Sequence, residues 1–173
     1  MTTSLTRIGL VAAFATALVS PALAAEPKVL GSEGAWTAFG GDQPKECWAV
    51  SPPKSTVNTD AEGKPREVTR SDIRLYVAYR PGQNGEVSFQ GGYPFAPDST
   101  VDVEIGSNKF KLFTDGENAW TGSPDEDAKL ISALRAGSEA VVKGRSSRGT
   151  RTTDTFSLAG ITAMTNKARD TCK

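Results

Sequence analysis

The sequence predicts a mainly β domain: an antiparallel β-sandwich with one inserted helix and a short helix near its C-terminal end. Three observations predict it. Apolar and polar residues alternate with a period of two along several short segments, as in strands with one buried face. Turn signals separate these segments, and the 173 residues include 17 glycines and 10 prolines. The apolar period becomes helical in two places. We therefore expect two packed layers, with a barrel as the second possibility.

The first 24 residues are organised as a secretory signal peptide. Arg7 supplies the positive charge, residues 8–19 form the apolar run, and Ala22-Leu23-Ala24 is a small-x-small cleavage site. A membrane anchor is the alternative, but a span needs about 20 apolar residues. We expect cleavage after Ala24, or after Ala25, and a single mature domain, residues 25–173, without a transmembrane segment. The expected location is the periplasm, with a secreted or surface-associated protein as a further possibility.

The strand candidates share alternating apolar positions and end at turns that contain glycine or proline. They are residues 36–39, 46–50, 73–80, 86–90, 101–105, 110–112, 139–143 and 153–158. Gly106-Ser107 is expected to close a hairpin with a type II′ turn. Residues 26–34 are expected to form a loose lead, and the polar residues 54–70 a long exposed loop.

The clearest helix covers residues 124–136. Ser123 can cap it, proline suits its first position, and Glu126 completes a capping box. Gly137 follows the last apolar residue of the pattern, where a left-handed glycine commonly ends a helix. We therefore expect the helix to end there.

The two cysteines, Cys47 and Cys172, are expected to form a structural disulfide. An isolated pair in an oxidising compartment normally becomes bridged. Helical spacing of Ile161, Met164 and Ala168 predicts a short helix that brings Cys172 back toward Cys47. Two thiols are too few for structural zinc, and a redox-active pair is normally C-x-x-C.

Composition excludes several functions. The chain contains no histidine, which rules out Ser-His-Asp, Cys-His and histidine-ligated metal chemistry. Its net charge of +0 argues against a nucleic-acid binder. We expect no metal and no cofactor. Two close carboxylates would leave a hydrolase possible, and the candidates lie in one hairpin region: Asp98, Asp102, Glu104, Asp115 and Glu117. Alternation places Asp102 and Glu104 outward beside lysines, as ordinary surface charges.

A basic segment before the last strand is the main candidate for a binding site. Lys143, Arg145, Arg148 and Arg151 lie within nine residues, with serine and threonine hydroxyls between them. Arginine forks and hydroxyls suit a phosphate, sulfate or carboxylate. The alternative is a solvated loop whose arginines pair with nearby acids.

Aromatic residues offer a second kind of contact. Trp36, Trp48 and Trp120 each lie in or beside a strand candidate, where large aromatics are usually core. Exposed, they would mark a sugar or partner surface. Tyr93, between Gly92 and Pro94, is expected to be more exposed than the tryptophans and to be a possible ligand contact.

Matching pieces of a known family run through nearly the whole mature chain. They are Trp36, Cys47-Trp48, Ser51-Pro52, Tyr79-Arg80-Pro81, Gly92-Tyr93, Phe110-Lys111-Leu112-Phe113, Ala119-Trp120, the helix 127–134, the loop 144–150, Asp154-Thr155-Phe156-Ser157-Leu158, Gly160 and Cys172. With them the chain resembles the invasion-associated locus B (IalB) family of exported bacterial proteins. The resemblance implies an immunoglobulin-like β-sandwich in a Gram-negative envelope. It implies no enzyme activity and supplies no agreed ligand or catalytic residue.

The sequence thus predicts a periplasmic, non-enzymatic binding or interaction protein of the envelope that contributes to host or surface contact. The expected partner is another envelope protein or an anionic glycan, bound by the basic segment, the loop 54–70 or a strand edge. A structural or stress-related envelope protein without a specific ligand is the alternative, with a carboxylate-dependent hydrolase less favoured.

Overall fold

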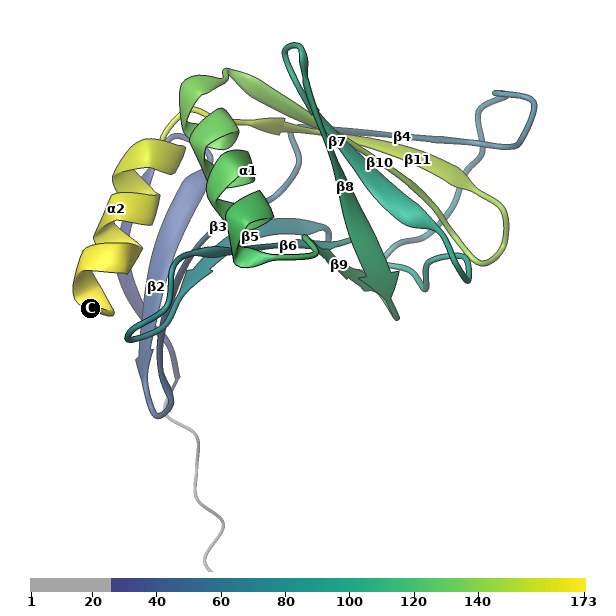
Figure 1. Ribbon diagram of the computed structural model, residues 1–173. Coiled ribbons are helices and arrows are strands. Elements are labelled where there is room, and N and C mark those ends of the chain that lie inside the picture. The colour runs from purple at the N-terminus through teal and green to yellow at the C-terminus, as the bar shows by residue number, and fades with distance from the viewer. Residues whose placement is uncertain (1–25) are drawn as a thin grey trace, which may run out of the picture.

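The computed structural model describes residues 26–173, so the expected signal peptide and its cleavage site lie outside the described residues (Figure 1). Two helices, α1 (Pro124–Ala136) and α2 (Ile161–Thr171), lie within this part of the chain. Neither is long and apolar enough to cross a membrane. The strands are β1 (Lys28–Glu33), β2 (Trp36–Asp42), β3 (Lys45–Ser51), β4 (Ser55–Thr59), β5 (Arg74–Tyr79), β6 (Glu86–Gln90), β7 (Thr100–Ile105), β8 (Asn108–Asp115), β9 (Asn118–Trp120), β10 (Glu139–Arg145) and β11 (Arg151–Ser157).

These strands form one antiparallel sheet in the order β1-β2-β3-β5-β6-β9-β8-β7-β10-β11-β4. The sheet folds over on itself, so that β3, β5 and β6 lie beneath β10, β11 and β4 (Figure 1). Side chains meet between the layers: the rings of Phe89 on β6 and Phe156 on β11 pack edge to face, 6.1 Å between centroids. The Trp36 indole donates a hydrogen bond to the Ser157 carbonyl at 2.9 Å. The predicted mainly β, antiparallel sandwich is confirmed, and its two layers are halves of one continuous sheet.

Alternation along the strands builds the core between these halves. Leu75, Val77 and Tyr79 of β5 are buried, and the residues between them face outward. Each fully buried valine, leucine or phenylalanine stabilises the fold by roughly 1.5–3 kcal/mol relative to its exposed state. The hairpin of β7 and β8 pairs Ile105 with Asn108, and Gly106 has the positive φ of +57° that the expected turn needs.

Helix α1 begins as its capping residues predict. The Ser123 hydroxyl accepts a hydrogen bond from the Glu126 amide at 3.3 Å, and the Glu126 carboxylate accepts one from the Gly122 amide at 2.8 Å. One turn further, the buried Asp127 carboxylate accepts the Val87 amide at 2.7 Å. This bond joins the helix to β6.

Gly137 ends α1, but the left-handed conformation expected for it is wrong. Its φ of −87° and ψ of 169° are extended. A Cβ at this position would lie 2.5 Å from Cγ2 of Ile105 and 3.1 Å from Cδ1 of Leu158. Glycine is therefore required by the close approach of the helix end to its neighbours.

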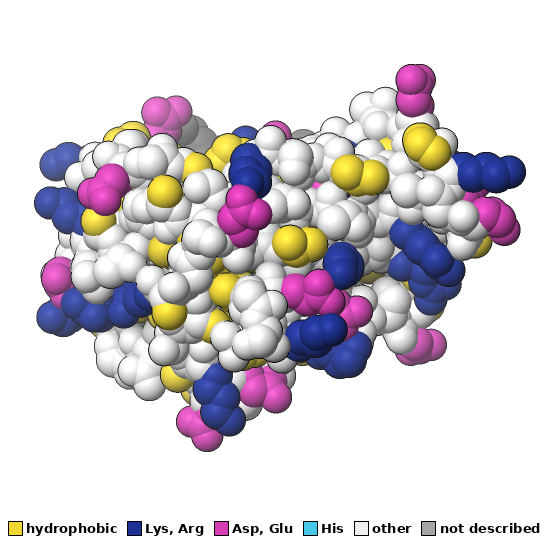
Figure 2. All heavy atoms as spheres, turned by 90° about the horizontal axis from the view of Figure 1, so that it is seen from above, with side chains coloured by type: hydrophobic (Ala, Val, Ile, Leu, Met, Phe, Trp, Pro, Cys, Tyr) yellow, Lys and Arg dark blue, Asp and Glu magenta, His cyan; other side chains and the backbone are white. Residues whose placement is uncertain are grey.

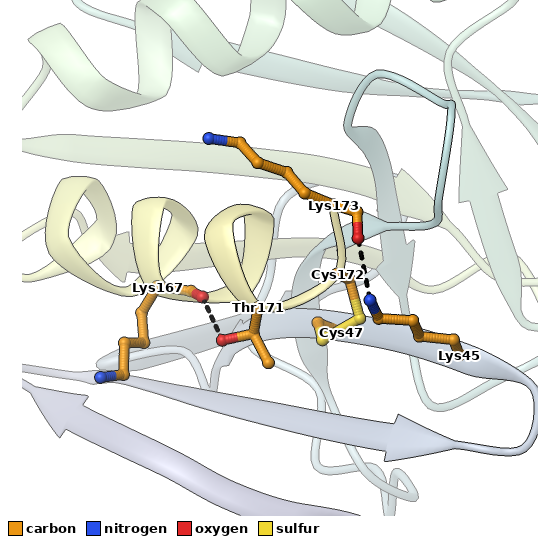
Figure 3. Close-up of a disulfide and its surroundings, with 6 residues drawn as sticks. All are labelled: Lys45, Cys47, Lys167, Thr171, Cys172 and Lys173. Atoms are coloured by element: carbon orange, nitrogen blue, oxygen red, sulfur yellow. Dashed lines mark hydrogen bonds between the residues drawn. A yellow bond between two sulfur atoms is a disulfide. The ribbon is translucent and has the colours of Figure 1, made fainter.

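Helix α2 packs on β1, β2, β3 and β5, and its buried residues include Ile161, Met164 and Ala168. The disulfide between Cys47 on β3 and Cys172, as predicted, ties its C-terminal end to the sheet (Figure 3). Beside it, the Lys45 ammonium donates a hydrogen bond to the Lys173 carbonyl at 2.8 Å. The end of the chain is thus fixed to an early strand by one covalent bond and one polar contact.

Two stretches expected to lack regular structure contain the edge strands. Residues 28–33 of the expected lead are β1, and residues 55–59 of the expected loop are β4, which pairs with β11. Both strands are mostly exposed, so neither shows a buried face in its sequence pattern. Main-chain hydrogen bonds to a neighbouring strand hold them in place. Such bonds leave no trace in the alternation of side chains.

Candidate functional site

The hairpin of β10 and β11 presents the predicted basic residues. Its register places Arg145 directly opposite Arg151, and both are exposed. Opposed residues of an antiparallel pair project from the same face, so the two arginine side chains start from neighbouring positions on one face. Arg148 is exposed in the turn between them. Like charges at opposed positions destabilise a strand pair, and an anion between them removes that repulsion.

The turn that carries Arg148 is held by its own hydrogen bonds. The Ser146 amide donates to the Thr150 carbonyl at 2.9 Å, and the Thr150 amide donates to the Ser146 hydroxyl at 3.1 Å. The Ser147 amide donates to the Pro94 carbonyl at 2.9 Å, which docks the turn on the preceding segment. A turn fixed in this way loses little conformational entropy when a ligand binds.

The four predicted basic residues do not act alike. Lys143 donates to the Glu104 carboxylate at 2.7 Å. This hydrogen bond and the charge of Lys143 lower the pKa of Glu104. In contrast, Arg145, Arg148 and Arg151 form no ion pair with any residue from 26 to 173. From above, acidic and basic side chains are interspersed over the molecule (Figure 2). These three arginines, hereafter the arginine tip, are the unneutralised part of the predicted site.

Tyr93 does not belong to the arginine tip; it is half-buried, as Trp48 and Trp120 are, and more exposed than Trp36. Its hydroxyl lies 2.6 Å from the Thr152 hydroxyl, and its ring packs on Phe95 with centroids 4.9 Å apart. The Arg70 guanidinium lies over the ring, 4.9 Å from its centroid. Burial raises the pKa of Tyr93 to about 12. Tyr93 turns inward because it covers the end of the sandwich beneath the hairpin.

A buried ion pair beneath the hairpin was not predicted. Two nitrogens of Arg70 each donate to one carboxylate oxygen of Asp154 at 2.7 Å, and these side chains are 6% and 0% exposed. Arg70 also donates to the Gly91 carbonyl through Nε at 2.9 Å and Nη2 at 2.6 Å. Burial raises the pKa of Asp154, and the hydrogen bonds and charge of Arg70 oppose that rise. Residues 60–73 connect β4 to β5, and the pair fastens the end of this 60–73 loop to β11.

The buried tyrosine leads to a prediction about alkaline stability. The pKa of Tyr93 is about 12 in the folded protein and about 10 in the unfolded chain. The contribution of the protonated Tyr93 to the free energy of unfolding is complete below pH 10. It is lost as the pH rises toward 12, because the unfolded chain releases the tyrosine proton at a lower pH than the folded protein does. We expect a loss of at most about 2–3 kcal/mol in the free energy of unfolding.

Urea unfolding of wild type and Tyr93→Phe over this pH range measures that loss. Tyr76 and Tyr79, whose pKa values burial also raises, are present in both proteins and cancel in the difference. Parallel pH profiles of the two proteins would contradict the prediction.

Several carboxylates form ion pairs or hydrogen bonds with other residues of the domain. On the outer face, Asp102 accepts from Lys111 at 2.7 Å, next to the pair of Glu104 and Lys143. Burial raises the pKa of Asp127, which is held by the Val87 amide, and Asp154 is held by Arg70. Among residues 26–173 no three potential metal ligands come together. The arrangement suits anion binding better than chemistry by two carboxylates.

The tryptophans divide into two kinds. Trp36 is fully buried, as predicted. Trp48 and Trp120 are half-buried on the outer face of the sheet, so their assignment to the core is wrong. In β3, Cys47 and Ala49 take the inward positions, and strict alternation then places Trp48 outside.

Comparisons with known proteins agree with the fold and place the chain in a family. The family model described as Invasion associated locus B (IalB) protein matches residues 41–169. No curated protein matches the chain. The crystal structure of invasion associated protein B from Bartonella henselae is similar at 13% identity and a TM-score of 0.53, covering 83% of this chain and 96% of that one. That likeness shows a shared fold. The matched residues include the arginine tip and the Arg70–Asp154 pair, and the chain belongs to the invasion associated locus B (IalB) protein family.

Proposed function

We propose that the chain is an exported, non-enzymatic binding protein of the bacterial envelope, in which the arginine tip binds an anionic group on a partner. One observation carries the proposal: Arg145 and Arg151 are opposed on one face of a hairpin, and no acid of residues 26–173 pairs with them. Two like charges at opposed positions of a strand pair destabilise the free protein. An anion that binds both arginines removes this repulsion, and the removal contributes to its affinity.

The chemistry of the arginine tip defines the partner. Guanidinium groups bind phosphate, sulfate and carboxylate through paired hydrogen bonds. Three of them at one end of a hydrogen-bonded hairpin suit a surface with several anions, such as an anionic glycan or an acidic patch of another envelope protein. Because the arginines are exposed, they also accelerate association through long-range attraction, which salt weakens.

Two features support export. The first 24 residues have the pattern of a secretory signal peptide. The bridge between Cys47 and Cys172 is of the kind that persists in oxidising compartments such as the periplasm. We propose the periplasm or the cell surface as the location. Family membership suggests an invasion-associated bacterial protein, and we propose contact with a host or another surface as the corresponding role.

Charge reversal of the arginine tip tests the proposal. The variant Arg145→Glu, Arg148→Glu, Arg151→Glu is compared with Lys28→Glu, Lys129→Glu, Lys167→Glu, which makes the same change in net charge at other exposed sites. On immobilised heparin, a sulfated glycan, we expect the first variant to bind about tenfold more weakly or worse, since each lost 1.4 kcal/mol is tenfold. The lysine variant should bind like wild type in the same salt.

Crosslinking of tagged protein in intact cells provides the second measurement. We expect a crosslinked partner in wild type and in the lysine variant, and its loss in the arginine variant. Equal heparin retention and equal crosslinking by both variants would show that the arginine tip is not the site. Absence of any crosslink or retention in wild type would favour a structural envelope protein.

A further inference from the structure

A second surface lies on the outer face of β3, β5, β6 and β9, in the half of the sheet that lies beneath β10 and β11 (Figure 1). It is a hollow of about 350 Å³ with Trp48 and Trp120 among its lining residues. The register pairs Trp48 with Ala78 and Trp120 with Ser88. The direct cross-strand partners of the two indoles are thus small. Across the strands the two tryptophans are three spacings apart, roughly 14 Å at about 4.8 Å each, and they are offset by two residues along the strands, because Ala78 pairs with Glu86 and not with Ser88.

Each tryptophan of the hollow stacks on a phenylalanine from a neighbouring strand. Phe39 on β2 stacks on Trp48 with centroids 5.7 Å apart and 18° between the ring planes. Phe113 on β8 stacks on Trp120 at 5.7 Å and 29°. Both phenylalanines come from the strand on the far side of the tryptophan from the hollow. The indoles are therefore held in position, and the side toward the hollow is free for a ligand.

The floor between the tryptophans is polar and mostly uncharged. Tyr76, Ser88, Gln90 and Asn118 bring two hydroxyls and two amides, which both donate and accept hydrogen bonds. The Tyr76 hydroxyl lies 3.3 Å from Oε1 of Gln90. These hydroxyls and amides lie between two aromatic walls, where a ligand can reach them. Binding sites typically combine apolar walls with a few placed polar groups.

The charged end of the hollow selects against anions. Arg80 pairs with Glu46 at 2.5 Å and with Glu86 at 3.3 Å, so two carboxylates surround one guanidinium. The net charge of this group is negative. An acidic ligand would be repelled here, whereas the arginine tip on the other layer attracts one. Anionic ligands are therefore disfavoured, and the uncharged hydroxyls and amides of the floor match a neutral ligand.

We propose that this hollow binds a short stretch of a neutral oligosaccharide. Sugar rings carry C–H groups on their faces and hydroxyls around their edges. The faces stack on Trp48 and Trp120, and the hydroxyls reach the amides and hydroxyls of the floor. The distance between the two indoles matches several linked sugar units rather than one. A proline-rich peptide is the competing ligand, since aromatic grooves also bind such helices.

Tryptophan fluorescence provides a direct test. The three tryptophans of the chain are Trp36, Trp48 and Trp120, and Trp36 is fully buried and gives a constant background. The disulfide-bonded protein is titrated with neutral tri- to hexasaccharides of glucose and of N-acetylglucosamine, and with a proline-rich peptide. We expect saturable fluorescence changes with at least one oligosaccharide series and with larger affinity for the longer members.

Variants locate the binding. Trp48→Ala and Trp120→Ala should each lower the affinity at least tenfold, measured by calorimetry where the fluorescent group is lost. The triple arginine variant should bind the sugar as wild type does, which separates this hollow from the arginine tip. Gln90→Ala keeps both indoles and should weaken binding severalfold without unfolding the protein.

Three results would overturn the proposal. The first is that wild type binds none of these oligosaccharides, and the second is that it binds only the proline-rich peptide. The third is that both tryptophan variants, shown by circular dichroism to be folded, bind the oligosaccharide with the affinity of wild type.

Discussion

Replacing Arg70 by leucine is expected to lower the free energy of unfolding by about 3–5 kcal/mol. The substitution leaves the Asp154 carboxylate, which is 0% exposed, without the guanidinium that neutralises it. It also leaves the Gly91 carbonyl without the two hydrogen bonds that Arg70 donates. Denaturation in urea measures the effect, with the slope of the transition as a check that the two states compared are the same.

Two controls separate the ion pair from packing. Arg145→Leu removes an exposed arginine that no acid of residues 26–173 contacts, and should change stability by no more than about 0.5 kcal/mol. The double variant Arg70→Met, Asp154→Leu removes both charges and should recover much of the stability, because neither buried charge is left alone. If Arg70→Leu unfolds at the same urea concentration as wild type, the pair is not what holds the 60–73 loop on β11.

Breaking the disulfide by Cys172→Ser is the second large effect. The bridge spans 125 residues, and the loop-entropy model gives a stabilisation of roughly 4–5 kcal/mol for a loop of this length. We expect a clearly lower melting temperature and early detachment of α2, whose C-terminal end the bridge fastens to β3. Calorimetry of oxidised protein measures the change.

Neighbouring polar contacts provide the comparison for the disulfide. Lys45→Ala removes the hydrogen bond to the Lys173 carbonyl beside the bridge and keeps the disulfide. The free energy of unfolding should therefore fall by about 1 kcal/mol or less. Wild type treated with a reductant should melt as Cys172→Ser does. Titration of two free thiols in the mature protein from cells would refute the bridge itself.

The fold followed from the sequence wherever side chains have a buried and an exposed face. Period-two alternation located β5 and β6, and the capping residues Ser123 and Glu126 located the start of α1. Gly137 marked its end, although through close packing and not through the left-handed conformation expected. The same signal is absent from β1 and β4, because these edge strands are mostly exposed. The continuity of the sheet was equally hidden, since the pairings of β6 with β9 and of β7 with β10, which connect its two halves, join segments that are separated in the sequence.

The candidate sites were predictable in part. Spacing identified the three arginines, but it did not show that Lys143 would be neutralised by Glu104 from another strand. Asp154 is at an inward position of β11, and an acid at such a position calls for a cation. Nothing in the sequence says that this cation is Arg70, because the partner comes from a loop far earlier in the chain. The contacts of Tyr93 were hidden for the same reason: its neighbours come from other segments.

The order of strands in the sheet has a kinetic consequence. β4, early in the chain, pairs with β11 near its end, and Cys47 bonds to Cys172. Such contacts give the fold a high contact order, and loop-closure entropy must be overcome before they stabilise anything. During synthesis, β1, β2, β3, β5 and β6 can pair with one another as they emerge, whereas β4 remains without its partner until β11 has emerged. Completion of the sheet therefore follows completion of the chain, and the unpaired β4 is a site of aggregation until then.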